Sequence, residues 1–156
     1  MEKDKATGRN ELKLDAKAAA AFKGEHTEGY NKVVAAVSSD KTAVVSVQST
    51  VGTFGDDGQF HVYNVARDFG GGASWDLGDG NSFVALSPDG NNSVPDQWHT
   101  QGPNGTKMPD PVGIIAGHEL LGHSLERMIG GDASEAKAQN VEKQLREEQG
   151  VPPRVP

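Results

Sequence analysis

Two histidines with a glutamate between them stand close together near the middle of the C-terminal half of the chain. The sequence over residues 117–123 reads Gly-His-Glu-Leu-Leu-Gly-His. Imidazole is a common protein ligand of divalent metals, and a carboxylate beside a metal-bound water can act as a general base. The segment therefore predicts a metal site in which His118 and His123 bind the ion and Glu119 moves protons.

The spacing of these histidines differs from the usual metallopeptidase pattern, His-Glu-x-x-His, in which the ligands are four residues apart on one helical face. His118 and His123 are five residues apart, and five residues of a regular α-helix rotate by about 140° beyond a full turn. One π-type turn would bring both rings back to one face. Gly122 favours such a turn, because glycine has no side chain to clash and is a poor residue for a regular helix.

The helix that carries the motif is predicted over residues 111–129, with Asp110 as its cap and Pro111 at its first position. Two glycines at positions 130 and 131 should close this helix. A second, amphipathic helix is predicted over residues 134–149, so the two helices should form an antiparallel hairpin.

A catalytic zinc needs a third protein ligand and one open position for water. The chain has no cysteine, so the candidates are carboxylates and the remaining histidines, His26, His61 and His99. In a hairpin that closes near Gly131, a residue eleven past the turn lies level with one eleven before it, which places Glu142 between the two histidines. Glu135 would then lie near Arg127. We therefore expect Glu142 as the third ligand, with Glu135 behind the ligands or as the alternative ligand.

The remaining sequence predicts an α+β fold with a small mixed or antiparallel sheet beside the helical hairpin. Residues 1–9 are expected to be a disordered or artificially added start, and residues 10–156 a single domain. Residues 91–108 lack periodicity and should form a long irregular loop. The other expected elements are two helices, over residues 10–23 and Thr27–Val37, and three strands, Thr42–Val51 and Gln59–Ala66 as a hairpin and Asn81–Leu86.

The composition excludes several kinds of partner. The chain has 22 acidic and 15 basic residues and a net charge of -7, which argues against binding a phosphate backbone and hence nucleic acid. The longest purely apolar run is the five residues 18–22, so neither a membrane span nor a signal-peptide core is predicted. We therefore expect a soluble chain that acts on protein or peptide, with its oligomeric state open.

The six residues His-Glu-Leu-Leu-Gly-His resemble the zinc motif of the dipeptidyl peptidase III family, in which both histidines bind zinc. This likeness covers residues 118–123, and the second motif of that family, Glu-Glu-Cys-Arg-Ala-Glu, is absent from the chain. The resemblance implies Zn²⁺ as the cofactor and His118 and His123 as its ligands.

A longer segment, residues 110–155, resembles the small metallopeptidase domains of bacterial effectors and polymorphic toxins. In those domains a Glu-rich helix follows the metal helix and ends in Val-Glu-x-x-x-Arg-x-Glu-x-Gly-x-Pro-x-Arg. This chain has the same pattern from Val141 to Arg154. The resemblance implies a zincin-like fold of the gluzincin kind, with two histidines and one glutamate on zinc. It also implies a bacterial domain that a parent protein exports without a signal peptide of the domain's own.

The predicted function is zinc-dependent hydrolysis of peptide bonds. Zinc lowers the pKa of its bound water, and Glu119 takes the proton and passes it to the leaving amine. The segments Asn81–Leu86 and Gln59–Ala66 are candidates for a strand that pairs with extended substrate. The alternative function is a non-catalytic zinc-binding or interaction module that retains the fold. Four residues are candidates for stabilising the oxyanion: Tyr30, Tyr63, His61 and His99.

Overall fold

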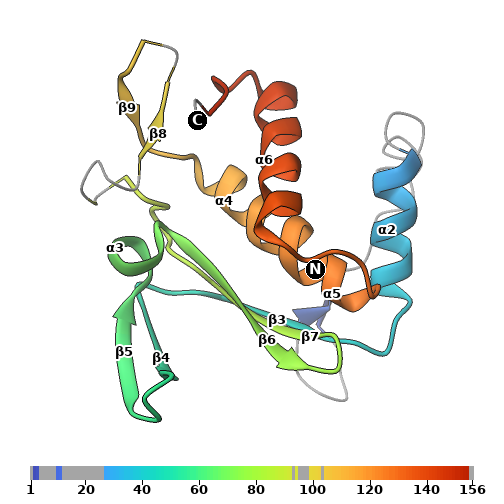
Figure 1. The fold of residues 1–156 in the computed structure, drawn as a ribbon. Coiled ribbons are helices and arrows are strands. Elements are labelled where there is room, and N and C mark those ends of the chain that lie inside the picture. The colour runs from blue at the N-terminus through green and yellow to red at the C-terminus, as the bar shows by residue number, and fades with distance from the viewer. Residues whose placement is uncertain are drawn as a thin grey trace. The chain divides into compact units, whose positions relative to one another are not determined.

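The structure of the chain is a computed structural model that describes residues 2–3, 10–11, 27–92, 94, 99–102 and 104–154. The chain divides into two compact units, Met1–Ser38 and Ser39–Pro156. Helices and small sheets both contribute, which confirms the predicted α+β class (Figure 1). Within the described residues, no helix combines the length and the apolar character needed to cross a bilayer.

The N-terminal unit contains two short strands and a helix. β1 (Glu2–Lys3) pairs antiparallel with β2 (Asn10–Glu11). The prediction that a helix begins at Asn10 is therefore wrong, because the backbone of Asn10 pairs with Lys3 instead of closing a helical turn. The predicted helix from residue 12 onward lies outside the described residues. α2 (Thr27–Val37) confirms the other predicted helix.

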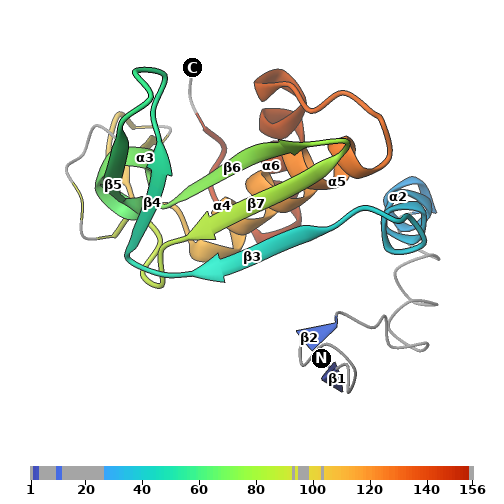
Figure 2. The ribbon, with the colours of Figure 1, turned by 90° about the horizontal axis from the view of Figure 1, so that it is seen from below.

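The larger unit is built on a three-stranded mixed sheet with the order β3, β7, β6 (Figure 2). β3 (Ala43–Val47) runs parallel to β7 (Asn81–Leu86), and β6 (Gly72–Gly78) runs antiparallel to it. The central strand β7 confirms a predicted strand, and its last three residues are buried, as expected for a strand covered on both faces. β6 was not predicted, since its glycine-rich ends resemble turns.

A separate antiparallel ribbon pairs β4 (Thr50–Phe54) with β5 (Phe60–Asn64), so the predicted hairpin is present. Its first strand is shorter than predicted, because the segment 42–51 breaks after Val47 and contributes β3 to one sheet and β4 to another. α3 (Val65–Phe69) ends β5 earlier than expected, since the side chain of Asn64 accepts a hydrogen bond from the Arg67 amide and caps this helix.

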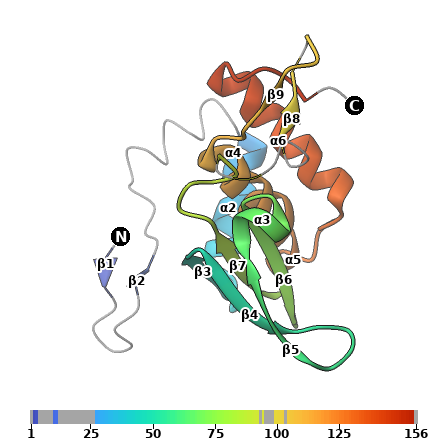
Figure 3. The same ribbon diagram turned by 90° about the vertical axis from the view of Figure 1, so that its left-hand side faces the viewer.

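The C-terminal part forms the predicted helical hairpin on one face of the sheet. The metal helix, named for the two motif histidines that it carries, consists of three consecutive segments: α4 (Val112–Gly117), η2 (His118–Ser124) and α5 (Leu125–Met128). Its middle segment, η2, is a π-helix. α6 (Glu135–Gln149) packs against α4 and η2 (Figure 3). Gly150 ends α6 in a left-handed conformation, as the sequence predicts, whereas Ser134, predicted to be the first residue of this helix, instead caps it. The core beneath the motif joins helix and sheet through Val84, Leu86 and Ile115.

The segment between the sheet and the hairpin is more ordered than predicted. β8 (Thr100–Gln101) and β9 (Lys107–Met108) pair antiparallel inside the expected irregular loop. The predicted cap of α4 is also wrong. Pro111 occupies the cap position without a side-chain bond, because the carboxylate of Asp110 instead accepts hydrogen bonds from Thr100 and Arg146.

Candidate metal centre

The π-helix η2 brings the two motif histidines together. Their rings lie 5.1 Å apart between centroids, at an interplanar angle of 71°, and each side chain is 13% exposed. In a regular α-helix the same spacing would separate them by about 140°. The predicted π turn is therefore confirmed, and it is the local feature that makes the motif usable as a metal site.

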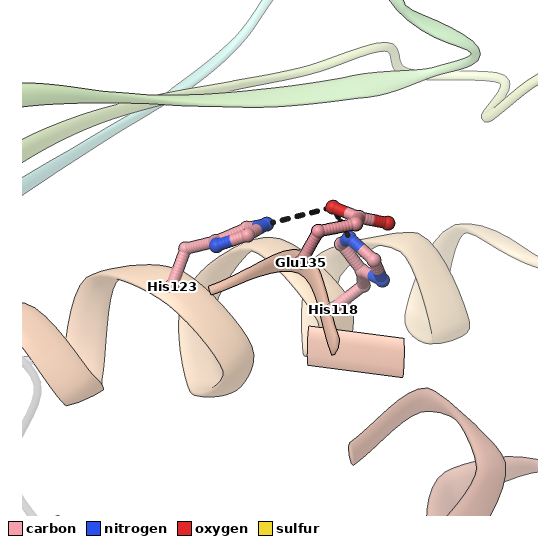
Figure 4. Close-up of side chains that lie close together, drawn as sticks. All are labelled: His118, His123 and Glu135. Carbon is pink, nitrogen blue, oxygen red and sulfur yellow. Dashed lines mark ion pairs between the residues drawn. The ribbon is translucent and has the colours of Figure 1, made fainter. Parts of the chain in front are cut away.

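Glu135, the first residue of α6, lies over both rings (Figure 4). Its Oε2 atom is 3.5 Å from Nε2 of His118 and 3.5 Å from Nε2 of His123. Two ligand atoms that bind a tetrahedral zinc at about 2.1 Å are about 3.4 Å apart. The three ligand atoms lie within 4.8 Å of one another. His118, His123 and Glu135 therefore form a group that could hold a metal ion.

The hairpin register differs from the sequence-based expectation, which placed Glu142 between the histidines and Glu135 near Arg127. The error arises after Gly131, where the chain does not turn directly into helix. Residues 131–134 are not helical and α6 begins only at Glu135, so this segment advances by more than the 1.5 Å per residue of a helix. Glu135 is thereby carried back to the level of His123, whose Nδ1 atom lies 2.8 Å from the carbonyl oxygen of Ala133.

Glu142 lies at the other side of His118. Its Oε2 atom is 3.2 Å from Nδ1, the ring nitrogen that does not face Glu135. Burial raises the pKa of Glu142, but hydrogen bonds from His118 and Arg146 and the charges of Arg146 and Arg154 outweigh burial and bring this pKa to about 2. Glu142 is thus ionised at neutral pH, so it can only accept, and Nδ1–H of His118 donates.

Both histidines are consequently held in the tautomer that a metal needs. The carbonyl of Ala133 fixes the proton of His123 on Nδ1, just as Glu142 does for His118. Each Nε2 atom then carries a lone pair directed toward Glu135. Hydrogen-bonded carboxylates and carbonyls behind ligating histidines are typical of metal sites, where they fix the ring orientation.

A buried charged network holds Glu142 in place. Nε of Arg146 donates to Oε1 of Glu142 at 2.8 Å, and Nη2 donates to the hydroxyl of Thr100 at 3.0 Å and to the carboxylate of Asp110. The Arg146 residue is only 1% exposed. Arg146 therefore ties the last turns of α6 to β8 and to the start of the metal helix.

Protonation of His118 opposes metal binding. Burial lowers the pKa of His118, but the hydrogen bond to Glu142 and the negative charges of Glu119 and Glu135 outweigh burial and hold this pKa above its ordinary value. A metal ion must therefore displace a proton from His118 as the pH falls toward that pKa.

Glu119 lies on the sheet side of the same helix and is 9% exposed. A Cβ atom added to Gly72 of β6 would be 2.9 Å from Cγ of Glu119, so the side chain packs directly against this strand. Burial raises the pKa of Glu119, and the charges of His118 and His123 act in the opposite direction. The site thus holds a carboxyl group of raised pKa next to the candidate ligands.

Gly122 permits α6 to approach the metal helix. A Cβ atom there would be 2.5 Å from Cα and 2.6 Å from Cβ of Ala138, closer than real atoms come. The sequence interpretation attributes this glycine to the π turn alone, whereas its missing side chain also makes room for α6. The resulting close packing positions Glu135 and Glu142 beside the histidines.

We expect Gly122→Ala to destabilise the protein by about 1–3 kcal/mol, because the new methyl group overpacks the contact with Ala138. Gly113→Ala in α4 is the matched control, since its nearest contacts would be Gln149 side-chain atoms at 4.0 Å. Alanine there should raise the free energy of unfolding by up to about 1 kcal/mol. Denaturant unfolding with a chelator present measures both. Equal stability of Gly122→Ala and wild type would contradict the close helix contact.

The other residues considered from the sequence belong to other elements or are not described. His61 pairs with Asp57 near the turn between β4 and β5, and Tyr63 packs against Phe69. Nε2 of His99 lies 3.0 Å from the carbonyl oxygen of Asn91. Tyr30 belongs to α2 of the N-terminal unit, and His26 lies outside the described residues.

Two features of the site were missed from the sequence. The strand β6 had a usable signal, because Ser74 and Asp76 alternate with Trp75 and Leu77, as in a half-buried strand. The buried Arg146 had no such signal, since an arginine on an amphipathic helix is usually solvated.

Comparisons with protein-family models, with curated proteins and with solved structures found no match. The functional argument therefore depends on the geometry of the site.

Proposed function

We propose that this chain is a zinc-dependent metallopeptidase with His118, His123 and Glu135 as ligands and Glu119 as general base. The observation that carries the proposal is the convergence of two Nε2 atoms and one carboxylate oxygen at separations suited to a tetrahedral ion. Three protein ligands leave a fourth position for water, which is typical of catalytic zinc and not of structural zinc.

The chemistry follows from the types of residue. A bound zinc ion supplies an acidified water and polarises the carbonyl group of the substrate. Glu119 accepts a proton from that water and delivers it to the nitrogen of the leaving amine. The raised pKa of Glu119 suits this role, because a carboxyl group with a pKa nearer to neutrality returns the proton more readily.

The edge of the sheet beside the metal helix supports peptide as the substrate. Asn81–Leu86, one of the two candidates from the sequence, is the central strand and has partners on both edges, so that candidate is wrong. The other candidate, Gln59–Ala66, contributes β5 to a separate ribbon. β6 is an edge strand of the three-stranded sheet: among the described strands it pairs with β7 alone. It also packs against η2. An extended peptide can add to this free edge through backbone hydrogen bonds.

Removing the metal should abolish hydrolysis and lower the melting temperature, and added Zn²⁺ should restore both. A ligand at 1,000 times its dissociation constant stabilises the folded state by about 4 kcal/mol. The measurements are metal analysis of the purified protein, thermal unfolding with chelator or zinc, and cleavage of a mixed peptide library. A melting temperature that is the same with chelator and with zinc would contradict the proposed metal site. Binding of zinc without cleavage would favour the alternative, a non-catalytic zinc-binding module.

A further inference from the structure

Arg127 lies on the same helix as the candidate ligands, one turn beyond His123, and its side chain reaches the edge strand. Its Nη1 atom donates to Oγ of Ser74 at 2.6 Å, and that oxygen is 3.0 Å from Oγ of Ser124. Ser124 is buried at 1% exposure. The guanidinium is thus fixed between the metal helix and β6 by a short polar chain.

Arg127 forms no direct ion pair with a carboxylate in the described part of the chain. Among the residues that the structure describes, no carboxylate oxygen lies within 4.0 Å of its guanidinium, whereas Arg146 contacts both Asp110 and Glu142. The charge is nevertheless close enough to Glu119 to lower the pKa of that carboxyl group, against the larger effect of burial. A half-buried guanidinium with several unused donors is suited to binding a carboxylate.

The strand β6 relates Arg127 to the reacting groups. Gly72 packs against Glu119, and Ser74, which holds Arg127, is the next residue on the same face of the strand. Residues two apart on a strand are about 7 Å apart. A peptide paired with β6 has side chains at the same spacing. A side chain two residues from the one beside Glu119 would therefore reach the guanidinium.

We propose that Arg127 and Ser74 form a subsite that binds a carboxylate of the substrate, an inference that rests on the proposed peptidase function. β6 runs from Gly72, beside Glu119, to Ser74, beside Arg127, so a peptide antiparallel to it passes Arg127 first. An Asp or Glu side chain on the N-terminal side of the cleaved bond would then be bound. In parallel pairing the C-terminal carboxylate of a short peptide would take the same place.

The test compares peptides that differ only in Glu or Gln at each position near the cleaved bond, each with a free or an amidated C-terminus. For zinc-loaded wild type, kcat/KM should be about 10–100-fold higher for the Glu peptide at one N-terminal-side position, as expected for one charge-assisted hydrogen bond. A preference for the free C-terminus instead would identify that carboxylate as the ligand. Equal rates for all of these peptides would overturn the subsite.

Variants assign the preference to Arg127. Arg127→Gln should bring the ratio of kcat/KM for the Glu peptide to kcat/KM for the Gln peptide close to one. Arg127→Lys keeps the positive charge but lacks the planar guanidinium, so it should retain part of the preference for the Glu peptide. Lys143→Gln, an exposed position on α6, is the matched loss of one positive charge and should leave the ratio unchanged. A full preference in Arg127→Gln would overturn the assignment.

Binding without turnover separates this proposal from the proposed function. The affinities of the same peptides for zinc-loaded Glu119→Gln protein, measured by fluorescence anisotropy, should show the same preference for the carboxylate. Binding with this preference but no cleavage by wild type would refute the peptidase and support the subsite. Cleavage by wild type with equal affinities for the peptides would support the peptidase and refute the subsite.

Discussion

Replacing Glu119 by glutamine is expected to lower kcat for peptide hydrolysis by about 10²–10⁴-fold, the usual contribution of a general base. The amide has nearly the shape of the carboxyl group but cannot accept the proton. Zinc should be retained, because the group that could hold the metal is made by His118, His123 and Glu135. Steady-state cleavage of a peptide, together with zinc content per chain, measures both expectations.

The folded state should tolerate this substitution. Burial already opposes the charged form of Glu119, so a neutral amide in its place costs little. Glu147→Gln, an exposed position on α6, is the matched control and should retain full activity. Undiminished hydrolysis by Glu119→Gln would exclude Glu119 as the base, and loss of zinc would show that Glu119 contributes to binding the metal.

Replacing Glu135 by glutamine is expected to weaken zinc binding more than replacing Glu142 by glutamine. The first substitution removes a charged oxygen directed at both Nε2 atoms. The second keeps an oxygen that can accept from His118 and should lower affinity by about 10–100-fold, as is typical of changes behind a ligand. Competition with a chromogenic chelator gives both dissociation constants.

Glutamine is preferable to alanine at position 142, because alanine would remove a partner from the buried Arg146 and unfold part of the site. The Glu135 side chain is 61% exposed, so its substitution should not change the melting temperature of the metal-free protein. The reverse order of zinc affinities would restore Glu142 as the ligand and contradict the hairpin register of the structure.

Much of the helical hairpin could be predicted because its signals are local. Gly150 ends α6, and the five-residue spacing of the histidines requires a π turn if both are to share a face. These are properties of single turns of chain. They do not depend on the register in which the two helices pack against one another.

The glutamate that lies beside both Nε2 atoms could not be predicted, because it depends on the register between the two helices. The expected register assumed that the helices meet at Gly131, whereas α6 begins only at Glu135. Serine is a preferred cap residue, so reading Ser134 as the cap would have placed the start of the second helix at Glu135, with non-helical chain before it. A difference of a few residues at the turn decides which of two glutamates faces the rings.

The sheet was predicted only in part, because strand pairing depends on contacts that are distant in sequence. β3 pairs in parallel with β7, which lies about 40 residues later in the chain. The next strand after β3, β4, pairs with β5 instead. The valines of β3, Val44 and Val45, suit a strand with any partner, so the sequence does not indicate which strand β3 pairs with. The aromatic residues Trp75 and Phe83 pack together on the face away from the metal helix, and Gly72 on the other face leaves the space that Ile115 and Glu119 occupy.

The π turn also determines which residues beyond the histidines face the sheet. Each helical residue advances the azimuth by about 100°, so in an uninterrupted α-helix Ser124 would lie about 140° from Glu119. With one residue absorbed by the π turn, that difference falls to about 40°, and Arg127 lies within about 20° of Glu119. Beyond the π turn, the side chains therefore point in the directions that they would have if the two histidines were four residues apart. The extra residue between the histidines is thus absorbed within η2, and the azimuth of α5 stays as it would be with the four-residue spacing.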